Sequence, residues 1–164
     1  MATRRTILKG LGALAILGGA ARVDRGVAVA QGHLRSLQPE EPVDTTMKRL
    51  FGSRPIRAVA DDGGPIRLDL PLIAEDGGLV PITIEVKSPM TPASHVKAIY
   101  VISDRNRRPL NARFTLTPAL GLALVGTTLR LGETTDVRAV AELSDGTLLM
   151  ARREVKVTVG GCGG

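Results

Sequence analysis

The sequence predicts an antiparallel β-sandwich preceded by one short helix. Apolar and polar residues alternate along several short segments, turn residues separate these segments, and no helical crossover lies between them. Alternation with a period of two places one face of each segment in a core and the other in water. The alternating segments are residues 66–70, 82–86, 96–102, 113–117, 137–143 and 155–159.

The helix is predicted ahead of the strands, over residues 45–51, with Asp44 as its N-cap and Gly52 as its stop. Three apolar residues with i, i+3 and i+4 spacing would form a buried stripe along it. These residues are Met47, Leu50 and Phe51. We therefore expect one side of this helix to be buried.

Glycine, proline and aspartate separate the predicted strands. Residues 61–65 and 76–78 mark turns, and Ser144–Thr147 is a turn between two alternating segments. Ile99 and Val101 make one predicted strand apolar on both sides. Roughly seven strands with alternating faces are typical of a sandwich of immunoglobulin-like type. The single cysteine and the absence of tryptophan exclude the core of an antibody-type domain.

The first 30 residues have the features of an export signal. Arg4 and Arg5 are followed by Lys9 and by a short apolar run of mostly small residues, 10–21. The run is too short and too rich in glycine to span a bilayer comfortably. The paired arginines resemble a twin-arginine signal, which exports folded proteins. We therefore expect residues 1–30 to be a signal peptide and the mature protein to lie in the periplasm.

The cleavage position has two candidates. Ala28–Ala30 supplies an A-x-A site, but the charged pair Asp24–Arg25 separates it from the apolar run, so cleavage near Ala20–Ala21 stays open. The polar residues that follow, 31–42, contain two prolines and are expected to form a linker. Residues 43–159 would then be the folded domain, made of the helix and the sandwich.

The charge and composition argue against a nucleic-acid-binding protein. Residues 1–30 carry five Lys or Arg against Asp24 alone, a net charge of +4, so +2 of the total of +6 remains for residues 31–164. Aromatic residues make up only 2% of the chain, which leaves almost no platforms for stacking bases. The basic loop of Arg105, Arg107 and Arg108 is expected to be an exposed hairpin end, with docking of an acidic partner as an alternative.

No active site is visible in the predicted domain. His33 lies in the expected linker and His95 opens a strand, and the two cannot build a zinc or copper site with one cysteine unless carboxylates help. The adjacent carboxylates Glu40–Glu41 and Asp61–Asp62 are expected to be solvated loop charges. No nucleophile elbow or phosphate-binding loop is present. We expect no catalysis by the domain itself, no metal and no cofactor.

The chemistry is concentrated in the last five residues, Gly160–Gly161–Cys162–Gly163–Gly164. Glycine adopts φ of both signs, so a flexible arm is predicted after the last strand. At about 3.3–3.6 Å per residue, the sulfur would reach roughly 10 Å beyond the sheet. A lone cysteine in an oxidising compartment has no intramolecular disulfide partner, and its exposed thiol retains some thiolate at neutral pH. We predict that Cys162 carries a covalently attached sulfur cargo.

Other roles for the tail stay open. Cys162 could be a free thiol without function, or it could tether an exported β-sandwich interaction module to a partner through a disulfide. The four glycines favour the carrier because they provide reach and access together. A thiocarboxylate carrier of ubiquitin-like type, built on Gly163–Gly164, is disfavoured. It needs ATP-dependent adenylation, which an exported protein lacks, and the pattern of a β-grasp helix is missing.

The tail also resembles that of a known family. Gly160–Gly164 is similar to the swinging-arm motif of SoxY, the sulfur-carrier subunit of the bacterial thiosulfate-oxidising Sox system. The twin-arginine signal and the helix around Met47–Phe51 share the likeness, which covers essentially the whole chain. Three further stretches carry it: Ser88–Thr91, Val140–Gly146 and Arg153–Val159. The turn at Arg105–Arg108 is more basic, and Leu120–Leu124 more apolar, than we expect of this family.

This resemblance implies an immunoglobulin-like fold and a heterodimer with SoxZ, a second β-sandwich subunit that is exported together with this one. It implies that the haem enzyme SoxXA joins thiosulfate oxidatively to Cys162, and that the hydrolase SoxB releases sulfate and leaves a sulfur-extended cysteine. In some bacteria, SoxCD then oxidises the remaining sulfane sulfur. Only Cys162 carries over as a functional residue, with the four glycines as its tether.

Overall fold

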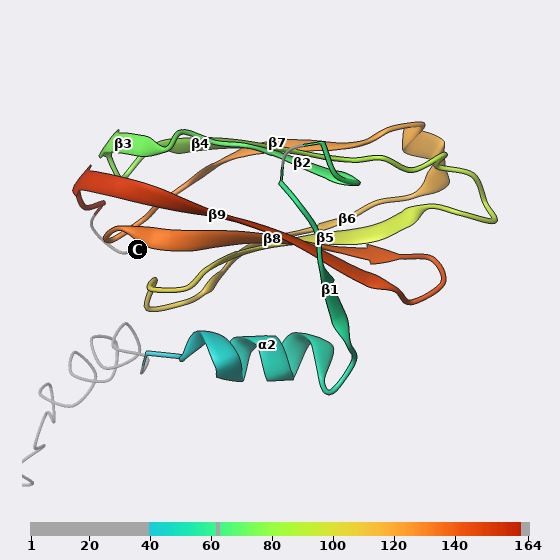
Figure 1. The fold of residues 1–164 in the computed structure, drawn as a ribbon, viewed down its shortest axis with the longest axis horizontal. Coiled ribbons are helices and arrows are strands. Elements are labelled where there is room, and N and C mark those ends of the chain that lie inside the picture. Colours follow the sequence, from blue (N-terminus) through green and yellow to red (C-terminus); the bar gives the residue numbers. More distant parts are fainter. Residues whose placement is uncertain (1–39, 62, 162–164) are drawn as a thin grey trace, which may run out of the picture. The chain divides into compact units, whose positions relative to one another are not determined.

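The structure, a computed structural model, describes residues 40–61 and 63–161. The expectations for the export signal, for most of the linker and for Cys162, Gly163 and Gly164 therefore lie outside the described residues. Two β-sheets pack face to face, and a helix covers the outer face of the larger sheet (Figure 1). The sandwich expected from the alternating segments is confirmed.

The larger sheet has six strands in the order β1-β9-β8-β5-β6, with β3 also paired to β9. Its strands are β1 Ile56–Ala58, β3 Ile73–Asp76, β5 Val96–Ser103, β6 Leu110–Thr115, β8 Thr135–Leu143 and β9 Leu148–Val159. The smaller sheet has three strands in the order β2-β4-β7. They are β2 Ile66–Asp69, β4 Val80–Val86 and β7 Ala123–Leu129, the last preceded by a 3₁₀ turn at Pro118–Leu120.

Strand β9 organises one edge of the larger sheet. It pairs with β8 on one side, and on the other side with β1 near its start and with β3 near its end. These last two pairings are parallel, whereas the other strand pairs are antiparallel. The departure from the antiparallel prediction follows from the path of the chain. It leaves β1 for the smaller sheet, forms β2, and returns to the same edge of β9 as β3 (Figure 1).

The two sheets enclose an aliphatic core, as the low aromatic content requires. Alternate residues of β2 and β4 are buried, and those between them face solvent. The largest fully buried side chains of this core are Ile66, Leu68, Val80, Ile82, Ile84, Val86, Val96, Ile99, Val101 and Leu131. Burial of one such side chain stabilises a fold by about 1.5–3 kcal/mol. This core holds the two sheets of the sandwich together.

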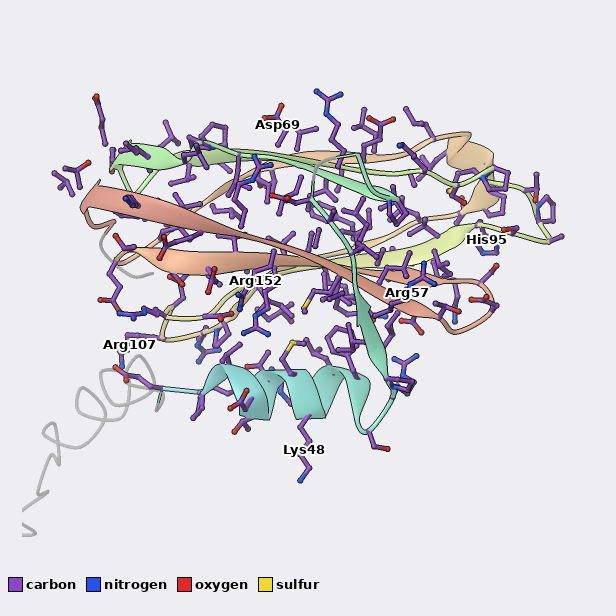
Figure 2. The ribbon with its side chains drawn as sticks, in the orientation of Figure 1. Lys48, Arg57, Asp69, His95, Arg107 and Arg152 are labelled. Carbon is purple, nitrogen blue, oxygen red and sulfur yellow. The ribbon has the colours of Figure 1, made fainter. Side chains whose placement is uncertain are left out.

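Helix α2, Val43–Phe51, lies against the outer face of the larger sheet. The Phe51 ring meets the Tyr100 ring edge-on at 5.0 Å between centroids, and Met47 and Leu50 pack around it. Lys48 points away from the sheet (Figure 2). The expected apolar stripe is therefore confirmed. The helix also explains why β5 is apolar on both sides, since one face meets the smaller sheet and the other meets α2.

The ends of α2 were predicted with one error. Gly52 ends the helix with a φ of 64°, and its N–H donates to the Lys48 carbonyl at 2.8 Å, as expected for a glycine stop. Asp44, predicted as the N-cap, instead lies in the first turn, because the helix begins two residues earlier than predicted, at Val43, and Pro42 occupies the cap position. Its carboxylate still lies near the positive end of the helix dipole.

The strand predictions missed three elements. The short strands β1 and β3 contain too few residues for alternation to be recognised. Strand β7 has buried, half-buried and exposed positions with Gly126 and two threonines in the middle, so its alternation is weak. The predicted turn at Ser144–Thr147 is confirmed, and it joins β8 to β9.

A polar cluster borders the interface between α2 and the sheet. The Tyr100 hydroxyl donates to Glu142 Oε2 at 3.1 Å, and Arg54 Nη1 donates to Glu142 Oε1 at 2.9 Å. Burial alone would raise the pKa of Glu142, but the hydrogen bonds from Arg54 and Tyr100 outweigh it and lower this pKa. Burial and the bond to Glu142 raise the pKa of Tyr100. The cluster thus fixes the segment after α2 to strand β8.

Replacement of Glu142 by Gln removes the ion pair with Arg54 and is expected to lower the free energy of unfolding by about 1 kcal/mol at neutral pH. The loss is no larger because solvent partly screens the exposed Arg54 guanidinium. The Glu142 pKa is lowered in the folded state. Its contribution is therefore present above the pKa of the unfolded chain and is lost as the pH falls through the folded value. Urea unfolding at several pH values between neutral and acid measures the difference in free energy of unfolding between the unchanged protein and Glu142→Gln. Glu75→Gln, at an exposed position, is the control. A difference that persists unchanged at acid pH would contradict the assignment.

Candidate functional site

The candidate site is the end of β9, from which the chain continues into the glycine-rich tail. Cys162, Gly163 and Gly164 lie outside the described residues, as do Arg4 and Arg5. The structure describes Gly160 and Gly161, the first two residues of the expected arm. They follow β9 at the end of the sandwich where β3 also lies (Figure 1).

Three backbone hydrogen bonds connect the end of β9 to neighbouring segments, and one of them involves Gly161 directly. The Gly77 N–H donates to the Val159 carbonyl at 2.7 Å, the Leu131 N–H donates to the Gly77 carbonyl at 2.7 Å, and the Gly161 N–H donates to the Leu131 carbonyl at 3.0 Å. Segments from three parts of the chain therefore meet through their main chains. We call this arrangement the glycine clasp. It consists of Gly77, Gly78, Leu131, Gly132, Gly160 and Gly161.

The clasp requires glycine because the backbones approach too closely for a side chain. A Cβ on Gly161 would lie 2.6 Å from the Cα and N atoms of Gly78, and one on Gly160 would overlap the Gly132 carbonyl oxygen. A Cβ on Gly77 would overlap the Leu131 carbonyl oxygen and lie 2.9 Å from the Gly161 nitrogen. Distances under 3.0 Å to backbone atoms are not tolerated without movement. Glycine at 160 and 161 thus serves close packing, a role that the sequence analysis did not assign.

The turn at Asp76–Gly78 was predicted, but its contact with the tail was not. Asp76 Oδ1 accepts a hydrogen bond from the Gly78 N–H at 2.7 Å, which stabilises the turn between β3 and β4. Gly77 is buried beneath the tail. The pairing of two Gly-Gly dipeptides more than 80 positions apart leaves no local signal in a sequence.

A buried asparagine supports the Leu131 side of the clasp. Asn106, which is 6% exposed, donates from Nδ2 to the Arg130 carbonyl at 2.7 Å and to Asn111 Oδ1 at 2.9 Å. Its Oδ1 accepts from the Gly132 N–H at 3.3 Å. Asn106 lies between Arg105 and Arg107, so the basic loop contributes one side chain to the interior. The loop itself joins β5 to β6 and is exposed, as predicted.

A polar groove of about 590 Å³ opens beside the tail. Its lining includes Asp104, Arg105, Gly132, Glu133, Thr134, Thr135, Asp136, Glu154, Val157, Thr158 and Gly160. Three of its four carboxylates are in ion pairs: Asp104 with Arg138 at 2.6 Å, Glu133 with Arg105 at 3.8 Å and Asp136 with Arg152 at 3.6 Å. The hydrogen bond to Asp104 raises the pKa of Arg138. These ion pairs neutralise most of the negative charge, so the groove has only a small excess of carboxylates.

The other predicted polar residues are structural or exposed. His95 is partly buried at the end of the sandwich opposite β3, and its Nδ1 lies 3.2 Å from the Thr91 carbonyl oxygen (Figure 2). Asp61 accepts from Arg153 at 2.7 Å, and Glu41 pairs with Arg49 at 2.9 Å. Hydrogen bonding from Arg49 lowers the pKa of Glu41. Asp62 and His33 lie outside the described residues.

In residues 40–61 and 63–161, no group of three or more His, Cys, Asp or Glu side chains is placed to hold a metal ion. Within the same residues, no helix has the length and apolar character needed to cross a bilayer.

Two exposed apolar side chains flank the tail. Leu79 follows the Gly78 residue on which Gly161 packs, and it is 70% exposed. Val159, the last residue of β9, is 65% exposed. Apolar side chains that leave water on binding are the usual source of docking energy. The end of β9 therefore combines a hydrogen-bonded backbone with exposed apolar side chains at neighbouring positions.

A sequence model described as "Sulfur oxidation protein SoxY" matches residues 47–162, which is most of the chain. The match extends from helix α2 to Cys162, the only cysteine in the sequence. The chain belongs to the SoxY family. A comparison with curated proteins found no match.

Solved structures agree with the SoxY assignment and with the fold. The sulfur carrier protein SoxY from Chlorobium limicola f. thiosulfatophilum is 30% identical, with a TM-score of 0.58, over 71% of this chain and 96% of that one. A superoxide reductase (neelaredoxin) from Ignicoccus hospitalis is 18% identical, with a TM-score of 0.53, over 61% of this chain and 94% of that one. A putative superoxide reductase from Thermotoga maritima is 16% identical, with a TM-score of 0.52, over 62% and 93%. The reductases share the sandwich fold with this SoxY chain.

Replacement of Asn106 by Ala is expected to lower the free energy of unfolding by about 2–4 kcal/mol, because it leaves the Arg130 carbonyl and the Gly132 N–H without their partner. The neighbouring Arg105→Ala removes only an exposed ion pair and should cost less than about 0.5 kcal/mol. Thermal and urea unfolding of both variants measure the difference. Equal effects from the two substitutions would show that Asn106 does not support this segment.

Proposed function

We propose that this SoxY-family protein is a covalent carrier of sulfur intermediates during periplasmic thiosulfate oxidation, with the intermediates attached to the Cys162 thiol. The observation that carries the proposal is that the family match ends on Cys162, the only cysteine of the chain. The name of the Chlorobium relative, a sulfur carrier protein, supports the same role. The glycine clasp also supports the proposal, because Gly161, the residue before Cys162, is hydrogen-bonded to the sandwich.

The chemistry of such a carrier needs only the thiol from this chain. In the first step, the Cys162 thiol and thiosulfate form a thiosulfonate, R–S–S–SO₃⁻, with release of one proton and two electrons, which a partner oxidoreductase accepts. In the second step, water cleaves the bond to the sulfonate, which gives R–S–S⁻, sulfate and two protons. Activation of the thiol must come from the partners, since the tail holds no cationic side chain beside Cys162. The protein is in this view a non-catalytic subunit.

The partners follow from the family. We propose SoxZ as the heterodimer partner, and transient docking to SoxXA, SoxB and, where present, SoxCD. The exposed Leu79 and Val159 side chains support docking at the end of β9, because they would bring a partner's active site to the base of the tail.

Export is proposed to follow the twin-arginine route. Replacement of Arg4 and Arg5 together by Lys keeps the charge but removes the paired guanidinium groups. We expect the variant to remain in the cytoplasm as the uncleaved precursor, whereas the unchanged protein is recovered from the periplasm. Cell fractionation followed by intact mass measurement checks this, and the mass also gives the cleavage position. Normal export of the double variant would contradict the twin-arginine assignment.

Mass spectrometry of the purified mature protein tests the carrier role. After cells receive thiosulfate, non-reducing intact and peptide masses should show thiosulfonate or sulfur adducts on Cys162 that dithiothreitol removes. The Cys162→Ser variant should show none, because no other cysteine exists. A free thiol or a plain disulfide to a partner, whatever the sulfur supply, would instead support the disulfide-tethered interaction module.

A further inference from the structure

We propose that the glycine clasp fixes the point from which the C-terminal arm extends, so that the clasp glycines are positioning residues for Cys162. The inference rests on the proposed carrier function and concerns how the carrier directs its thiol. The observation behind it is the contact of Gly160 and Gly161 with Gly77, Gly78 and Gly132, which lie far from the tail in the sequence. None of these last three belongs to the glycine-rich tail itself.

The clasp holds the chain beyond the end of the last strand. Strand β9 ends at Val159, yet Gly161 still donates a hydrogen bond to Leu131, and both Gly160 and Gly161 contact backbone from other segments. Gly161, the last residue that the structure describes, is therefore held against the sandwich. Asn106 fixes the opposite side through the Arg130 carbonyl and the Gly132 N–H.

A fixed Gly161 changes the reach that the glycine-rich sequence suggests. If the arm moved freely from Val159, two more residues would contribute about 7 Å of extended chain. With the clasp closed, Cys162 directly follows a residue that is hydrogen-bonded to the sandwich. A shorter tether raises the effective concentration of the thiol at a partner that docks on this end of the sandwich. The clasp thus shortens the tether of Cys162 and fixes the point on the sandwich from which that tether starts.

The clasp depends on a small balance of free energies. Fixing the backbone of one residue costs about 1–2 kcal/mol, and more for glycine. A backbone hydrogen bond returns about 0.5–1.5 kcal/mol net. The close packing around Gly77 supplies the remainder through van der Waals contact. One added methyl group on a clasp glycine is therefore enough to open it.

Gly161→Ala is the decisive variant. Its Cβ would lie 2.6 Å from backbone atoms of Gly78, so the tail must move away and the bond to Leu131 must break. The position is near the chain end, so the sandwich should keep its stability. Gly126→Ala in β7 is the matched control, because its Cβ would have no neighbour closer than 3.8 Å. Gly77→Ala opens the clasp from the other side.

The test is a nitroxide spin label on Cys162 of the full mature protein, observed by electron paramagnetic resonance. We expect the fast-motion component to increase at least about twofold in Gly161→Ala and Gly77→Ala and to be unchanged in Gly126→Ala. Amide exchange at residue 161 should accelerate at least about fivefold in Gly77→Ala, as expected for the loss of one hydrogen bond. Reaction of the unlabelled thiol with iodoacetamide should stay within about twofold across the series, while loading by a partner enzyme should show a raised KM in the two opened variants.

Coincident spectra for the unchanged protein and Gly161→Ala, together with unchanged exchange at residue 161 in Gly77→Ala, would overturn the clasp proposal. That result would leave the carrier function intact if sulfur adducts form on Cys162. If the spectra of the unchanged protein and Gly161→Ala differ but no sulfur adduct forms on Cys162, the clasp is supported and the carrier function is rejected. The label reports on the tail without any sulfur chemistry, so the two failures are distinguishable.

Discussion

The close approach of three backbone segments at the end of β9 determines where the chain leaves the sandwich. Gly77, Leu131 and Gly161 belong to separate parts of the sequence, and a Cβ on Gly77 or Gly161 would lie less than 3.0 Å from neighbouring backbone atoms. The hydrogen bonds that join them continue the pairing of β3 with β9 beyond the strands. Because the chemistry proposed for the protein lies just beyond Gly161, this contact connects the fold to its function.

The rest of the fold gives the clasp a rigid base. The larger sheet is buried on both faces, by the smaller sheet on one side and by α2 on the other. Strand β9 has twelve residues and pairs along both edges, with β8 on one side and with β1 and β3 on the other. A strand held in this way has little freedom at its end. The sandwich thus offers a firm attachment for the glycines that follow β9.

The sequence was sufficient for the architecture because the signal for a β-sandwich is local. Alternation in β2 and β4, the turn at Ser144–Thr147 and the stripe on α2 depend on neighbouring residues. The parallel pairing of β1 and β3 with β9 was not predictable, since these strands are short and the pairing depends on the path of the chain. Asp44 was placed wrongly because a helix start can shift by one or two residues at little energetic cost, and here it lies two residues earlier than predicted.

The candidate site was predictable only in part. The composition of the tail pointed to Cys162 and its four glycines, and the family match includes the cysteine. The sequence suggested flexibility for all four glycines, because glycine composition is a local property. The packing of Gly160 and Gly161 against Gly132 and Gly78 is a tertiary contact, and no pattern within the tail encodes it. The role of Asn106 was likewise not predictable, because it lies between two charged residues of an exposed loop and acts through tertiary hydrogen bonds.

The carrier account is tested most directly by thiosulfate that carries a different sulfur isotope at each position, supplied to the mature protein with its oxidising and hydrolysing partners. The account predicts that the label of the outer, sulfane sulfur remains on Cys162 in a form that dithiothreitol releases, while the label of the inner sulfur appears as sulfate. Sulfate formed with neither label ever bound to the protein would contradict it.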